Sequence, residues 1–241
     1  MLNEDQIEKL VGYGEKLGMN PVRLRWRLRN WSKNGLSIGV SLVTILVIFN
    51  VVAYLRLYLF EPGWGFSGKT LFAFGSTHGA WVFTYGEYWR LISSQFLHGG
   101  IMHLAFNLFA LSIIGPKIEE VFGTQKLFVF YIITGAAGFL AACFFNKVMS
   151  VGASGAVLGL AGVGCGYGFR DGTAAGKELG QTMLSWLIFS TIAGLFLPID
   201  HASHFGGFVT GAFLGYSIRP NLWPTKTAKY ITSLAFIVCA G

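Results

Sequence analysis

Residues 152–169 read GASGAVLGLAGVGCGYGF, an uncharged stretch that contains seven glycines. A second glycine-rich stretch, HFGGFVTGAFLGYSI, occupies residues 204–218. Glycines at four-residue spacing occur in both stretches, namely Gly155 and Gly159 in the first and Gly207, Gly211 and Gly215 in the second. Small residues at this spacing allow helix backbones to approach closely within a membrane. We therefore expect the two stretches to form a pair of closely packed helices.

The composition around these stretches is that of a membrane protein. Of the 241 residues, 53% are hydrophobic and 12% are charged, and the mean hydropathy is +0.56. Soluble domains carry about 25% charged residues. A spanning helix needs about 20 apolar residues, and six apolar stretches come near this length: residues 36–60, 101–115, 127–145, 152–169, 179–198 and 202–218. We extend the second stretch back to His98. The sequence then predicts an all-α, polytopic membrane bundle with a six-span core.

The chain divides into three parts on this basis. Residues 1–35 form a cytoplasmic N-terminal tail without a cleaved leader, with a short amphipathic helix expected over residues 1–20. Residues 36–219 form the six-span core. Residues 220–241 contain an inner loop and then a shorter apolar run, at residues 230–241. We interpret this run as the truncated start of a seventh span, with an interfacial helix as the alternative.

The net charge of +7 is explained by membrane topology rather than by nucleic-acid binding. With the N-terminal tail placed inside, 14 of the 18 Lys and Arg residues fall on the inner side and 4 on the outer side. Since cytoplasmic loops carry an excess of these residues, we expect the N-terminus in the cytoplasm. The basic run RLRWRLR at residues 23–29 precedes the first span, where it can contact anionic lipid.

Polar residues gather at the outer ends of three expected spans. With the tail inside, the second, fourth and sixth spans run from the outer face inward, so their first residues lie near that face. These residues are His98, His103 and Asn107 on the second span, Ser154 on the fourth, and His201 and His204 on the sixth. The remaining histidine, His78, falls in the outer loop of residues 61–95, whose many aromatic residues are typical of a membrane interface. This distribution indicates a single polar site.

A serine and a histidine at one depth predict nucleophilic catalysis. Close contact of the glycine-rich helices would bring the Ser154 hydroxyl within reach of the His204 imidazole, as an activated nucleophile requires. Residues 152–169 give about 27 Å of helix at 1.5 Å per residue, against a hydrocarbon core of about 30 Å. We therefore expect Ser154 to lie a few ångströms below the outer surface, in a cavity that water can enter.

An oxyanion formed by such an attack needs hydrogen-bond donors that are already in place. The backbone N–H of Ser154 at a helix N-terminus is one candidate. The Asn107 amide and the His103 ring are two others, since residues four apart share a helix face. Asp200 and Glu87 are on the correct side, but neither is at an obvious orienting position. We therefore favour a Ser–His dyad without an acid.

Other interpretations of these residues are weaker. His201 is a competing base, but it lacks the glycine face that follows His204 and lies nearer the surface. The histidines of the second and sixth spans could bind a metal, yet no His-Glu-x-x-His helix is present. The three cysteines fall inside predicted spans and indicate no disulfide framework. A transporter or channel would show inverted repeats or charges buried in mid-span, and neither occurs.

Several motifs in order resemble the rhomboid family of intramembrane serine proteases over residues 37–219. They are Tyr88-Trp89-Arg90, Phe96-Leu97-His98, His103 with Asn107, Gly115-Pro116-Lys117-Ile118-Glu119 closing on Gly123, Gly152-Ala153-Ser154-Gly155, and His204 with Gly207 and Gly211. The resemblance implies that Trp89 and Arg90 belong to a membrane-embedded first loop. It also implies that Glu119 is a structural residue near the inner end of the second span.

The resemblance further implies an activity and its residues. Ser154 would be the catalytic nucleophile, His204 the general base, and His103 and Asn107 the oxyanion-stabilising donors. The expected function is a serine endopeptidase that cleaves the transmembrane segments of single-span proteins near the outer face. The alternative is a non-cleaving rhomboid-like binder of client helices, whose usual mark is loss of the serine or histidine.

The expected partners are transmembrane substrates and the lipid bilayer. We expect no cofactor, no metal and no nucleic acid. The short tail without a transit peptide favours a multi-pass protein of a bacterial inner membrane.

Overall fold

The computed structural model describes residues 3–16, 21, 24–25, 28, 41–145, 149–194 and 199–220. These residues are largely helical, and no strand occurs among them beyond two isolated bridges, Gly65 with Gly100 and Thr77 with Ser150. The predicted all-α fold is therefore confirmed. The chain divides into two compact units, Met1–Ser41 and Leu42–Gly241, and each is described by itself.

The first unit contains the amphipathic helix α1 (Glu4–Lys16). The Asn3 side chain accepts a hydrogen bond from the Gln6 N–H (2.8 Å), and the Gln6 side chain accepts one from the Asn3 N–H (3.0 Å). This reciprocal cap satisfies two donors that a helix start leaves without partners. Ile7 and Val11 are buried on one face, whereas Leu10 is exposed. The amphipathic helix expected here is confirmed, and its predicted end at residues 17–20 lies outside the described residues.

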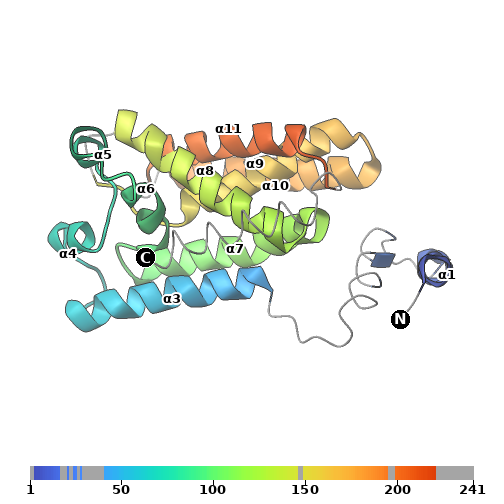
Figure 1. Cartoon of the computed structure of the whole chain (residues 1–241), viewed down its shortest axis with the longest axis horizontal. Coiled ribbons are helices and arrows are strands. Elements are labelled where there is room, and N and C mark those ends of the chain that lie inside the picture. Colours follow the sequence, from blue (N-terminus) through green and yellow to red (C-terminus); the bar gives the residue numbers. More distant parts are fainter. Residues whose placement is uncertain are drawn as a thin grey trace. The chain divides into compact units, whose positions relative to one another are not determined.

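The second unit holds the long helices of the expected core. They are α3 (Leu42–Phe60), α7 (Ile101–Phe122), α8 (Thr124–Phe145), α9 (Ser154–Asp171), α10 (Ala174–Ala193) and α11 (His201–Ser217). Between α3 and α7 the chain forms the short helices α4 (Gly68–Ala73), α5 (Gly79–Tyr85) and α6 (Arg90–Ser93) and the 3-10 helix η1 (Ser94–Phe96). Figure 1 shows α4, α5 and α6 gathered at one end of the bundle.

Three helices of the described chain, α3, α7 and α8, are long and apolar enough to cross a membrane. The other three core helices are the glycine-rich α9, α10 and the 17-residue α11. Three of the six predicted spans therefore have the length and hydropathy of a spanning helix, and the six-span core remains a prediction. The expected seventh span lies outside the described residues.

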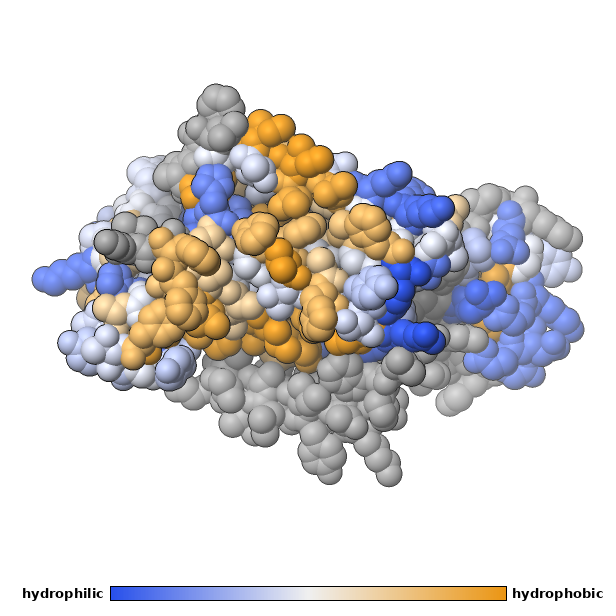
Figure 2. All heavy atoms as spheres, turned by 90° about the horizontal axis from the view of Figure 1, so that it is seen from above, coloured by the Kyte–Doolittle hydropathy of each residue, from blue (hydrophilic) through white to orange (hydrophobic). Residues whose placement is uncertain are grey.

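The outer surface of the second unit is apolar over much of one face (Figure 2). Large exposed hydrophobic side chains occur on each long helix that faces outward, for example Phe49 and Leu55 on α3, Phe106 and Phe109 on α7, and Phe205 and Phe213 on α11. Soluble monomers rarely expose apolar patches of this extent. Such a surface is stable in lipid rather than in water.

Helix α9 forms the core of the bundle, and 13 of its 18 residues are buried. Its most extensive contact is with α11, which lies beside it (Figure 1). A β carbon placed on Gly207, Gly211 or Gly215 would overlap a backbone carbonyl oxygen of α9, that of Gly155, Gly159 or Val163 respectively. The close helix pair predicted from the glycine spacing is confirmed. Any larger residue at these positions would push the two backbones apart.

Helix α7 differs from its prediction at both ends. It begins at Ile101 instead of His98, because Gly100 pairs with Gly65 in the loop of residues 61–95. It also continues past residue 115, through Pro116, to Phe122. The buried Glu119 explains this extension: its Oε1 accepts hydrogen bonds from the Leu42 N–H (3.2 Å) and the Thr124 hydroxyl (2.9 Å). Glu119 thus ties α7 to the starts of α3 and α8, as a structural residue would.

Candidate active site

Ser154 is the first residue of α9 and follows a sharp turn at Gly152. The φ of Gly152 is +122°, a conformation that residues with a side chain rarely adopt. The preceding residue, Ala153, provides no side-chain cap. The first N–H groups of an α-helix have no partner within the helix. The serine hydroxyl therefore lies at a helix start whose backbone donors can serve a ligand.

Two hydrogen bonds fix the segment that leads into Ser154. The Gly152 N–H donates to the carbonyl oxygen of Ser94 (2.9 Å), and the Ala153 N–H donates to Nε2 of His98 (3.4 Å). His98 is fully buried, and its ring meets that of His103 edge-on with 5.1 Å between the centroids. His98 therefore supports the backbone beside Ser154, a role that its position in the sequence did not specify.

His103 and Asn107 of α7 face the same segment. A β carbon on Gly152 would lie 2.6 Å from Nε2 of His103 and 3.6 Å from Nδ2 of Asn107. Nδ2 of Asn107 donates one hydrogen bond to the His103 carbonyl (2.9 Å). A side-chain amide carries two N–H donors, so the second can serve a ligand. Both side chains predicted as oxyanion donors thus lie against a residue two positions before Ser154.

His204 is buried in the first turn of α11. A β carbon on Gly155 would lie 2.5 Å from the Ser203 hydroxyl, and one on Gly207 would overlap the Gly155 carbonyl. The residue after Ser154 therefore touches both the residue before His204 and the residue three positions after it. This contact brings the two helix turns that carry Ser154 and His204 together.

The two histidines of α11 both approach the end of α10. Nδ1 of His204 lies 3.4 Å from the Ser190 hydroxyl. The ring of His201 lies against Gly194, where a β carbon would be 2.5 Å from Cε1 of the ring. His201 is exposed and His204 is 8% exposed, in agreement with the expectation that His201 lies nearer the surface.

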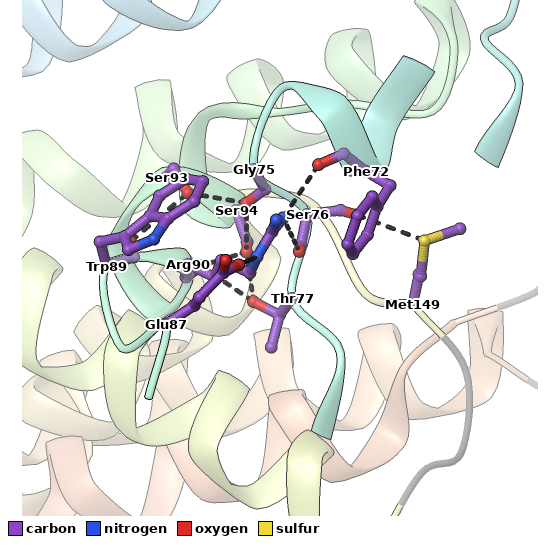
Figure 3. A network of polar contacts seen from close by, with 10 residues as sticks. All are labelled: Phe72, Gly75, Ser76, Thr77, Glu87, Trp89, Arg90, Ser93, Ser94 and Met149. Carbon is purple, nitrogen blue, oxygen red and sulfur yellow. Dashed lines mark hydrogen bonds and ion pairs between the residues drawn. The ribbon is translucent and has the colours of Figure 1, made fainter. Parts of the chain in front are cut away.

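Arg90 joins several parts of the loop of residues 61–95, which packs beside this site (Figure 3). Arg90 is 5% exposed, and its guanidinium donates to the carbonyl oxygens of Phe72 (2.9 Å) and Ser76 (3.1 Å). It also forms an ion pair with Glu87, at 2.5 Å. The guanidinium lies over the Phe72 ring, 4.2 Å from its centroid, and over Trp89, at 4.6 Å. One buried cation thus joins α4, α6 and the turn between α4 and α5.

The loop then reaches the serine segment through Thr77 and Ser94. Thr77 exchanges two backbone hydrogen bonds with Ser150, at 3.0 and 3.1 Å. The hydroxyls of Thr77 and Ser94 also contact each other (Figure 3), and the Ser94 carbonyl holds Gly152. Arg90 is therefore linked by hydrogen bonds, through Ser76 and its neighbour Thr77, to the segment that precedes Ser154.

A metal centre finds no support in the described part of the chain. No three His, Cys, Asp or Glu side chains are grouped there as metal ligands would be. Cys143 and Cys165, on α8 and α9, are buried free thiols.

A family model, the Rhomboid domain, matches residues 85–221, which include Ser154, His204, His103 and Asn107. The chain belongs to the rhomboid family. RHOMBOID-like protein 5 of Arabidopsis thaliana is 40% identical over 155 residues, which cover 61% of this chain and 49% of that protein. Rhomboid protease GluP of Bacillus subtilis (strain 168) is 31% identical over 172 residues, covering 70% and 34%. Rhomboid protease AarA of Providencia stuartii is 28% identical over 222 residues, covering 81% and 78%.

The chain spans about half the length of the plant relatives it matches. Its apolar helices and its membership of the rhomboid family make it an integral membrane protein. The relatives come from plants, one of them named as mitochondrial, as well as from bacteria. A bacterial inner membrane therefore remains a prediction.

Proposed function

We propose that this rhomboid is an intramembrane serine endopeptidase in which Ser154 is the nucleophile and His204 the general base. The observation that carries the proposal is that α7 and α11 both contact the start of α9. Gly152 lies against His103 and Asn107 of α7, and Gly155 lies against Ser203 of α11. A nucleophile, a base and oxyanion donors must meet in this way. Two relatives bear the name rhomboid protease, which adds support.

In the proposed reaction the Ser154 hydroxyl attacks the carbonyl carbon of a peptide bond, and Nε2 of His204 takes its proton. Nδ1 lies 3.4 Å from the Ser190 hydroxyl, which can accept a hydrogen bond from Nδ1–H in the tautomer that leaves Nε2 without a proton. The imidazolium then protonates the leaving amine, and the serine remains acylated. A water molecule, deprotonated by His204, hydrolyses the ester and restores the enzyme.

The negative charge on the substrate oxygen would be met by donors that are already in place. The Asn107 amide and the His103 ring lie against Gly152, two residues before Ser154, and the backbone N–H groups at the start of α9 are further donors. Fixed donors stabilise a developing oxyanion more than mobile water does, because they need no reorganisation.

The substrates we propose are single-span membrane proteins cut near the outer face. In this account residues 36–219 form six spans, and the charge asymmetry keeps residues 1–35 in the cytoplasm. A peptide bond in a regular helix is shielded by its hydrogen bonds, so the favoured substrate span is weakened near its outer end by Gly, Pro or small polar residues.

The test is cleavage of a single-span reporter by the full chain in liposomes. Wild-type protein should cut the reporter, and Ser154→Ala should not. A second reporter, in which the weak residues of the span are replaced by Leu and Val, should insert equally and be cut far more slowly. A non-cleaving binder of client helices is the competing function, and it would retain both reporters without cutting either.

A further inference from the structure

Asp200 begins the helix that carries His204. Its Oδ1 accepts a hydrogen bond from the Ser203 N–H (3.0 Å), and its backbone carbonyl accepts one from the His204 N–H (3.1 Å). Asp is among the preferred residues at this capping position, where its side chain satisfies a donor of the first turn. The direction in which α11 starts, and with it the position of His204, depends on Asp200.

The second carboxylate oxygen of Asp200 reaches a different part of the chain. Oδ2 accepts a hydrogen bond of 2.6 Å from the Ser150 hydroxyl. Ser150 is 5% exposed, lies four residues before Ser154 and is held by its two backbone hydrogen bonds to Thr77. One carboxylate therefore joins the segment that leads into Ser154 to the helix start that leads into His204.

We propose that Asp200 is a positioning residue that sets the separation of Ser154 and His204 through these two hydrogen bonds. This inference rests on the proposed function. Proton transfer from a serine to a histidine requires hydrogen-bond geometry, and a misplacement of about 1 Å can cost about 10²-fold in rate. Asp200 acts by its two acceptor oxygens and not as the acid of a triad, since those oxygens are engaged with Ser203 and Ser150, while Nδ1 of His204 faces Ser190.

The experiment measures kcat and KM of the full chain in liposomes for Asp200→Ala, Ser150→Ala and the double variant. Each single variant should lower kcat by up to about 10²-fold and leave KM unchanged, because the dyad and not substrate binding is misaligned. The double variant should be no slower than Asp200→Ala, since the two residues act through one bridge. Ser150→Ala removes only a hydroxyl, so it keeps the test valid if Asp200→Ala fails to fold.

Two further variants separate positioning from helix capping and from charge. Thr173 caps α10 in the same way, accepting from the Gly176 N–H (3.1 Å), so Thr173→Ala should lower the melting temperature and leave kcat unchanged. Asp200→Asn retains an acceptor for Ser203 and an amide for Ser150, and should recover most of the kcat that Asp200→Ala loses.

The inference is overturned if Asp200→Ala and Ser150→Ala both keep the wild-type kcat while Ser154→Ala is inactive. It is also overturned if Asp200→Asn is as slow as Asp200→Ala, or if the effects of the two single variants multiply in the double variant. A wild-type protein that cuts no reporter would instead refute the proposed function.

Discussion

Gly152 and His103 are in direct contact: a β carbon on Gly152 would lie 2.6 Å from Nε2 of the histidine. His103 belongs to α7 and Gly152 to the turn before α9, so their contact brings α7 against the segment that leads into α9. It leaves no space for a side chain at position 152 beside His103.

Replacement of Gly152 by alanine should therefore abolish cleavage. The new methyl group would displace His103, and the φ of +122° would add about 1–3 kcal/mol of backbone strain. Reporter cleavage and thermal unfolding check this expectation. The control is Gly172→Ala, because Gly172 has a φ of +69° and open space around its β position. That variant should lose some stability and keep its activity. Full activity in Gly152→Ala would mean that the contact is unimportant.

His103→Ala and Asn107→Ala should each slow cleavage without stopping it. Loss of one oxyanion donor typically costs about 10²–10³-fold in rate, and backbone donors at the start of α9 would remain. The measurement is kcat for the reporter, with Ser112→Ala as a control. Ser112 is an exposed residue of the same helix, and its hydroxyl donates a hydrogen bond to the Leu108 carbonyl one turn away (2.7 Å). Wild-type rates in both single variants would exclude an oxyanion role for these side chains.

Arg90→Lys should destabilise the protein although the substitution retains the positive charge. Lysine cannot reproduce the planar guanidinium that serves two carbonyls and Glu87 together. Hydrogen bonds to charged groups contribute about 1.5–3 kcal/mol each, so we expect a loss of at least about 2 kcal/mol in unfolding free energy. Arg56→Lys is the matched control, since Arg56 is exposed and lies 5.3 Å from the Phe74 ring centroid. Equal stability of the two variants would contradict the role given to Arg90.

The proposed topology can be tested by cysteine labelling in intact cells, with the native cysteines replaced. A membrane-impermeant reagent should reach Lys69→Cys in the outer loop and should not reach Ala175→Cys at the start of α10. Both positions are exposed, so burial does not decide the result. Labelling of Ala175→Cys alone would place the active site on the cytoplasmic side.

The helix pair α9–α11 could be predicted from the sequence, because glycines at four-residue spacing in an apolar helix allow a second helix backbone to approach closely. Gly207, Gly211 and Gly215 meet α9 as their spacing indicated. The residues of the candidate site could be predicted for a similar reason. Polar side chains such as His103 and Asn107 are rare in apolar spans, so their position in the sequence marked them as candidates for a functional site.

The supporting contacts could not be predicted in this way. Ser150, Asp200 and Ser190 are residue types common in loops and helix ends, and their partners are 50 or 14 positions away in the chain. Only the folded backbone brings them together. The predicted length of α7 was too short, because Pro116 and the charged Glu119 interrupt the apolar pattern of the sequence. In the structure the helix continues past both residues, since the Glu119 carboxylate is buried and accepts hydrogen bonds at the starts of α3 and α8.

The central claim is that Ser154 is a nucleophile activated by His204, and covalent labelling tests it most directly. The full chain is treated with a fluorophosphonate probe, and mass spectrometry locates the modified residue. We predict modification of Ser154 alone, lost in His204→Ala and retained in His201→Ala. Modification of another serine, or labelling that persists in His204→Ala and disappears in His201→Ala, would contradict the account.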